Sequence, residues 1–144
     1  MTAVLCTFDV EGVPVQQGSK HLLPTARGPR LVEEQDRGAR RGRLKRWRAT
    51  VAWSARAAYH GAPAAGALEL EATFRLPRPR TVTRARPAVK PDLSKLVRAL
   101  EDAMTGIVWG DDAQVVRYGS VEKVYADEHQ GPGVRVVVRR AREP

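Results

Sequence analysis

The sequence contains a single cysteine, Cys6, so no disulfide can form within the chain and no Cys-rich zinc site is available. The three histidines, His21, His60 and His129, are far apart and lack the spacing of metal ligands. These absences argue against a zinc enzyme. The patterns G-x-S-x-G and G-x-x-x-x-G-K-[ST] do not occur either, which argues against a serine hydrolase with a nucleophile elbow and against a nucleoside triphosphatase.

Long hydrophobic runs are also missing. No apolar stretch approaches the roughly 20 residues needed to cross a bilayer. The N-terminus, MTAVLCTFDVEG, lacks the basic start and apolar core of a secretory signal. We therefore expect a cytoplasmic protein.

Acidic residues are outnumbered, with 16 Asp and Glu against 25 Lys and Arg, for a net charge of +9 over 144 residues. The length predicts one domain spanning residues 1–144. The positive charge favours a polyanionic partner such as nucleic acid. The alternative is a compositional bias toward Arg and Ala with no functional meaning.

Hydrophobic periodicity predicts four strands and two helices. Alternating apolar residues indicate strands at residues 3–10, 68–75, 115–125 and 134–140, the third with a bulge near Gly119, while a helical period covers residues 44–59 and 93–104. The order β-α-β-α-β-β predicts an α+β domain with a small mixed sheet packed by two main helices. Residues 17–43, rich in Gly, Pro and Arg, are expected to form a long loop. Trp47 and Trp53, at helical spacing, are expected in the core or an interface rather than stacked on bases.

Basic side chains concentrate before the first helix and in the Pro-rich segment before the second. They are candidates for contact with the DNA backbone, with solvated loops and an ordinary linker as the alternatives. The candidate DNA-binding residues are Arg40, Arg41, Arg43, Lys45, Arg46, Arg78, Arg80, Arg84, Arg86, Lys90 and Lys95.

Carboxylates flank the second helix in this basic chain. Asp92 precedes the helix, and Asp111 and Asp112 follow it in a turn. Ser94, Arg98 and Glu101 share its polar face, at spacings of four and three residues. Hard oxygen ligands suit Mg²⁺, although Asp also favours helix caps and turns for structural reasons alone. Both interpretations are open at this point.

The stretch KPDLSKLVRALEDAMTGIVWGDDAQVV resembles the RusA family of Holliday junction resolvases, whose pattern is roughly [K/R]-x-D-L-D-N-L-x-K-A-x-x-D-A-L followed by D-D-A-Q-V. Weaker similarity covers VEGVPVQQGSK and the last two strands. The resemblance implies a homodimer that cleaves four-way DNA junctions with Mg²⁺, for which Mn²⁺ can substitute.

By that resemblance, Asp92 and Asp112 are catalytic metal ligands, and Arg98 stands at the position of the family's functional lysine. Ser94 replaces the remaining family aspartate, and Ser94 and Asp111 complete the expected ligand set, with Glu101 as a more distant alternative. We expect a Mg²⁺-dependent junction endonuclease. The alternatives are a DNA-binding protein whose cleavage is weakened or lost because of Ser94, and a structural or regulatory protein without preference for branched DNA.

Overall fold

The computed structural model describes residues 3–18, 20–23, 25–33 and 42–144. Its elements are β1 (Val4–Glu11), β2 (Lys20–Leu23), β3 (Arg30–Glu33), α1 (Arg43–Ala58), β4 (Leu68–Leu76), α2 (Leu93–Met104), the short 3₁₀ helix η3 (Asp112–Gln114), β5 (Val115–Tyr125) and β6 (Gly133–Arg140). Among the described residues, no helix is both long and apolar enough to cross a bilayer.

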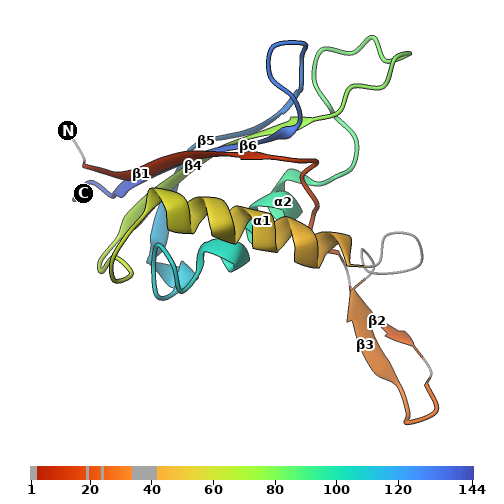
Figure 1. Cartoon of the computed structure of the whole chain (residues 1–144), viewed down its shortest axis with the longest axis horizontal. Helices are drawn as coiled ribbons and strands as arrows, with labels where there is room; N and C mark the ends of the chain where they lie inside the picture. Colours follow the sequence, from red (N-terminus) through yellow and green to blue (C-terminus); the bar gives the residue numbers. More distant parts are fainter. Residues whose placement is uncertain (1–2, 19, 24, 34–41) are drawn as a thin grey trace.

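The main sheet has four strands in the order β1-β6-β4-β5. The β1–β6 and β4–β6 pairs are antiparallel, whereas β4 and β5 are parallel and joined through α2. Both helices lie on one face of this sheet (Figure 1). The predicted α+β fold, with a mixed sheet, two helices and the order β-α-β-α-β-β, is confirmed.

The core lies between this sheet and the helices. Alternate residues of β1, β4 and β6 are buried on the helix side, as the period of two requires. Helix α1 buries Leu44, Trp47, Val51 and Ala55, which lie on one stripe. Trp47 is 4% exposed and lies in the core, as expected, whereas Trp53 is 76% exposed and lies outside it, so its place in an interface stays a prediction.

The prediction of a loop over residues 17–43 is wrong in part. Strands β2 and β3 pair antiparallel as a separate two-stranded sheet that projects from the body (Figure 1). Thr25 and Gly28 close the turn through reciprocal backbone hydrogen bonds of 3.1 and 3.0 Å, and Gly28 has a φ of 106°. Each strand has only four residues, too few to show a period in the sequence. Residues 19, 24 and 34–41 lie outside the described residues.

The predicted bulge near Gly119 is confirmed. In the β4–β5 ladder, Leu70 pairs with Tyr118 and Ala72 pairs with Val121, so β5 contains one extra residue between these pairs. The side-chain alternation of β5 is therefore reset after Tyr118. This reset bears directly on the functional site.

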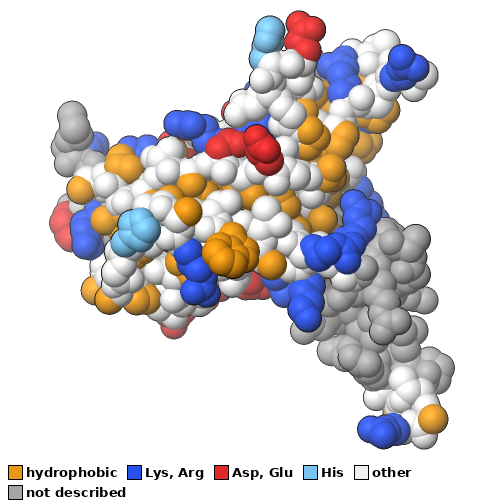
Figure 2. Space-filling model, viewed as in Figure 1, with side chains coloured by type: hydrophobic (Ala, Val, Ile, Leu, Met, Phe, Trp, Pro, Cys, Tyr) orange, Lys and Arg blue, Asp and Glu red, His pale blue; other side chains and the backbone are white. Residues whose placement is uncertain are grey.

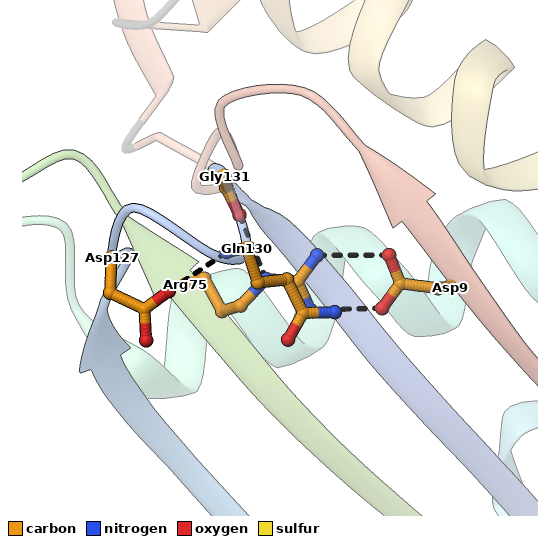
Figure 3. A network of polar contacts seen from close by, with 5 residues as sticks. All are labelled: Asp9, Arg75, Asp127, Gln130 and Gly131. Atoms are coloured by element: carbon orange, nitrogen blue, oxygen red, sulfur yellow. Dashed lines mark hydrogen bonds and ion pairs between the residues drawn. The ribbon is translucent and has the colours of Figure 1, made fainter.

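A buried arginine ties the β5–β6 turn to the sheet (Figure 3). Arg75 is 6% exposed and lies on the sheet face away from the helices. Its guanidinium donates two hydrogen bonds of 2.9 Å to the Asp9 carboxylate and one of 2.8 Å to the Gly131 carbonyl. Gly133 opposes Arg75 in the ladder, and a Cβ there would lie 2.5 Å from the arginine Nη2. The missing side chain at Gly133 leaves the space that Arg75 occupies.

Candidate functional site

Helix α2 begins where the sequence predicts, and its first turn leaves the Asp92 carboxylate available. Asp92 is the N-cap residue, but its side chain makes no capping hydrogen bond. The carboxylate instead lies 3.5 Å from the Lys95 ammonium, and the Asp92 side chain is 46% exposed. The Asp92 side chain therefore does not cap the helix.

The two aspartates after α2 have different environments. Asp111 caps η3, because its carboxylate accepts the Ala113 N–H at 2.8 Å while the Gln114 side chain accepts the Asp111 N–H at 3.1 Å. The exposed Asp112 side chain has no hydrogen-bond or ion-pair partner among the described residues. Asp111 thus shapes the turn, and Asp112 carries the uncommitted carboxylate.

Asp112 lies in the electrostatic neighbourhood of Glu101 and Tyr118. The Tyr118 hydroxyl donates to both Glu101 carboxylate oxygens at 3.1 Å. Burial raises the pKa of Glu101, the Tyr118 hydrogen bond lowers it, and the charges of Asp112 and Asp102 raise it. Burial and the Glu101 carboxylate raise the pKa of Tyr118 to about 12. The C-terminal half of α2 therefore contributes an acidic group that burial and neighbouring negative charge push toward its neutral form.

The bulge in β5 places a second anchor beside the other end of α2. Tyr118 and Lys123 are five residues apart and would face opposite sides of a regular strand. Because of the extra residue, Lys123 pairs with Phe74 and faces the helix side, as Tyr118 does opposite Leu70. The Lys123 ammonium donates to the Val89 and Pro91 carbonyls, both at 2.9 Å. Lys123 thus fixes the backbone that leads into Asp92.

The polar face of α2 lies between these anchors. Ser94 and Arg98 are exposed and have no side-chain partner among the described residues. Asp92 and Glu101 are nine residues apart, or about 13 Å along the helix axis. Within the described part of the chain, no three acidic, His or Cys side chains converge as metal ligands. The joint coordination of one ion by Asp92 and Asp112 therefore stays a prediction.

Most of the basic side chains in the Pro-rich segment have partners within the protein. Arg78 lies over the Tyr125 ring at 5.1 Å, Arg84 donates to the Tyr125 hydroxyl at 2.9 Å, and Arg86 pairs with Glu122 at 2.9 Å. These contacts hold residues 77–91 against β5. The arginines still present positive charge, but they also have a structural role that the sequence did not reveal.

The remaining candidates for DNA contact lie mainly near the start of α1. Figure 2 shows cationic side chains gathered at that end of the helix, beside the β2–β3 hairpin. Arg43, Lys45 and Arg46 belong to the first turn of α1, and Arg80 and Lys90 lie in the Pro-rich segment. Lys95 pairs with Asp92 at 3.5 Å. Arg40 and Arg41 lie outside the described residues.

The sequence does not predict four residues that contact the candidate site or the segment before it: Gln16, Tyr118, Lys123 and Tyr125. Gln16 accepts the Asp92 N–H through Oε1 at 2.6 Å, a contact across 76 positions that no local pattern indicates. Tyr118 and Lys123 were recoverable in principle, because a bulge between them was expected and implies that they share a face. That consequence becomes specific only when the pairing register is known.

Comparison with known proteins assigns the chain to a family. Residues 23–139 match the family described as Endodeoxyribonuclease RusA. A stretch of 54 residues is 39% identical to the uncharacterized protein YqaN of Bacillus subtilis (strain 168) and covers 38% of this chain and about a third (35%) of that relative. The family match covers most of the chain and includes α2, both flanking acidic positions and the complete β4–β5 pair, so this protein belongs to the RusA family of endodeoxyribonucleases.

Proposed function

We propose that this protein is a Mg²⁺-dependent endodeoxyribonuclease that cleaves four-way DNA junctions. The observation that carries the proposal is that the Asp92 and Asp112 carboxylates are not used as helix caps. Both stand where structural caps are common, yet neither carboxylate makes a capping hydrogen bond. Family membership supports DNA as the substrate, and the net charge of +9 supports a polyanionic one.

The available donors fit Mg²⁺ by their chemistry. Asp92 and Asp112 supply carboxylate oxygens, and Ser94 supplies a hydroxyl between them in the chain. Mg²⁺ commonly retains several waters and needs only one or two protein carboxylates. When bound, it would lower the pKa of a coordinated water and neutralise charge that develops on the phosphate.

The protein's own residues would position the DNA. Arg98, exposed on the polar face of α2, would stabilise negative charge on the scissile phosphate. Lys123 would hold the backbone before Asp92 in place, and Tyr118 would hold Glu101. Paired cuts in opposing strands need two active sites, so we also propose a symmetric homodimer.

Ser94 favours a second candidate function. Because Ser94 stands at a position where the family pattern has Asp, one carboxylate ligand is missing. In this alternative the protein binds junctions and cleaves them slowly or not at all.

One set of variants separates the two functions. A synthetic four-way junction is incubated with Mg²⁺ or Mn²⁺, and cleavage and binding are measured for the natural protein and for Asp92→Asn, Asp112→Asn and Ser94→Asp. If the protein is a nuclease, the natural protein cleaves the junction, and both Asn variants bind the junction without cleaving it. The Ser94→Asp variant then reaches full cleavage at a lower metal concentration. The exposed residue Glu143 provides a matched control, since Glu143→Gln removes a carboxylate beyond β6.

The outcomes differ sharply. Binding without cleavage, with cleavage appearing only in Ser94→Asp, supports the alternative. Normal cleavage by both Asn variants contradicts the assignment of the site. Absence of any preference for branched over linear DNA contradicts both functions.

A further inference from the structure

A cavity of about 360 Å³ lies next to the N-terminus of α2. Its floor includes Leu76 and Tyr125, the last residues of the parallel strands β4 and β5. The carboxyl ends of parallel strands are a common place for ligands. The volume is within the range of about 300–1,000 Å³ typical of small-molecule sites. We call this space the carboxyl-end cavity.

The carboxyl-end cavity combines an apolar lining with a cationic rim. Val13 and five prolines are among its lining residues, and Tyr125 adds an aromatic ring. Arg43, Arg84 and Lys90 also line it, whereas none of the described lining residues is acidic. Such a lining suits a flat, apolar group attached to a negatively charged one.

Gln16 contributes a polar side chain, fixed by a hydrogen bond, to the lining of the cavity. The Gln16 side chain is 7% exposed and lines the cavity. Its Oε1 accepts the Asp92 N–H at 2.6 Å, which leaves Nε2 as a donor without a partner among the described residues. Nε2 is not among the side-chain atoms that are fully buried without a partner, so it is accessible and can donate to a ligand that supplies an acceptor.

The position of the cavity relates it to the candidate cleavage site. Lys90 and Pro91 line it and directly precede Asp92. The segment over it is held in place, because Arg84 donates to the Tyr125 hydroxyl and Arg78 lies over the Tyr125 ring. The cavity is therefore largely formed before any ligand binds.

We propose that the carboxyl-end cavity binds one unstacked nucleobase of the DNA strand whose phosphate lies at Asp92. The base would pack against the apolar lining and accept a hydrogen bond from Gln16 Nε2, while the cationic rim contacts the adjoining phosphate. Proteins commonly hold unstacked bases by such a combination of aromatic or apolar contact and nearby positive charge. The proposal rests on the proposed function, because it assumes DNA at the Asp92 end of α2.

The test uses 2-aminopurine, a fluorescent base that reports unstacking and burial. It is placed singly in a short single-stranded oligonucleotide and at each nucleotide next to the branch of a four-way junction. Emission and affinity are measured in EDTA for the natural protein and for two variants. Val13→Phe enlarges an exposed side chain that lines the cavity and so reduces its free volume. Gln16→Glu keeps the acceptor for the Asp92 N–H while removing the amide donor.

We expect the natural protein to change the emission of the oligonucleotide and of one position in the junction. Val13→Phe should lose this signal and weaken oligonucleotide binding by roughly 5- to 150-fold, the range for loss of one base-stacking contact. Gln16→Glu should also lose the signal and weaken binding, because it removes the amide donor and places a carboxylate in the cavity. The matched control is Val4→Phe, since Val4 is 51% exposed in β1 and does not line the cavity, whereas Val13 is 44% exposed. Thermal unfolding shows whether each variant is folded.

The possible failures are distinct. If no position responds, or if folded Val13→Phe and Gln16→Glu bind as the natural protein does, the cavity proposal is overturned even when junction cleavage is normal. If the oligonucleotide signal depends on Val13 while the junction is neither preferred nor cut, the cavity proposal stands and the proposed function falls.

Discussion

Replacing Asp9 with alanine is expected to destabilise the protein more than replacing its partner Arg75 with methionine. The Arg75 side chain is 7% exposed, whereas that of Asp9 is 32% exposed. In Asp9→Ala the guanidinium stays buried and keeps only the Gly131 carbonyl as an acceptor. Breaking a buried ion pair from one side costs about 3–5 kcal/mol, and partial access of water to the position of Asp9 reduces the expected loss to about 2–3 kcal/mol.

Arg75→Met has a smaller expected cost because it removes the buried charge itself. The carboxylate left behind is partly solvated, and the apolar side chain fills much of the same volume. We expect a loss of about 1 kcal/mol, since replacing buried charges by apolar groups of similar volume is often nearly neutral. The double variant should resemble Arg75→Met alone, because Asp9 then has no buried charge to compensate.

Urea denaturation at 25 °C measures these differences. With a slope of about 1–3 kcal/mol per M, the loss of about 2–3 kcal/mol in Asp9→Ala should lower the urea midpoint by about 0.7–3 M. Glu11→Ala is the matched control, because it removes an exposed carboxylate two residues along the same strand and should change stability by less than about 0.5 kcal/mol. A larger loss in Arg75→Met than in Asp9→Ala refutes the reasoning that the buried guanidinium sets the cost.

Three further predictions concern other parts of the structure. Lys123→Met should reduce junction cleavage while binding persists, because the ammonium fixes the backbone before the candidate metal ligand; equal losses of cleavage and binding contradict this role. Gly133→Ala should destabilise the protein by at least about 1–3 kcal/mol in the same urea assay, because the added Cβ would lie 2.1 Å from the Val10 carbonyl oxygen; an unchanged midpoint contradicts this. A hydrogen bond from Arg139 lowers the pKa of Glu71 in the folded state, so its contribution to stability is present above the ordinary pKa and is lost as the pH falls through the lowered value. Stability measured from pH 7 downward should fall less steeply in Glu71→Gln, and parallel curves contradict this prediction.

The regular elements were predictable because their patterns are long. The helix over residues 93–104 and the strand over residues 115–125 match α2 and β5 at both ends. Their apolar residues repeat over three turns of helix or eleven residues of strand, which leaves little ambiguity about type. Strands β2 and β3 were not predicted, because four residues do not establish a period. Helical spacing alone does not show how wide the buried stripe is, so it did not distinguish the buried Trp47 from the exposed Trp53.

For the candidate site, too, some features were predictable from the sequence and others were not. Its residue types and their order along the chain were visible in the sequence, including the Ser94 departure from the family pattern. The distinction between Asp111 and Asp112 was not visible, because it depends on which carboxylate the η3 turn uses as its cap. The sequence predicts either DNA contacts or an ordinary linker for residues 77–91, and neither interpretation indicates that Tyr125 and Glu122 engage three of the arginines there.

The sequence by itself determined the family, the α+β class, the boundaries of the main elements and the acidic positions around α2, because each of these is carried by local spacing. Tertiary structure alone decided which side chains meet. The pairing register, with one extra residue in β5, places Tyr118 and Lys123 on the same face of the sheet. The tertiary fold also brings the Gln16 side chain to the backbone N–H of Asp92. Such contacts join residues that are distant in sequence, so no local pattern specifies them, and they form only when burial of the shared core fixes the strands and helices against one another.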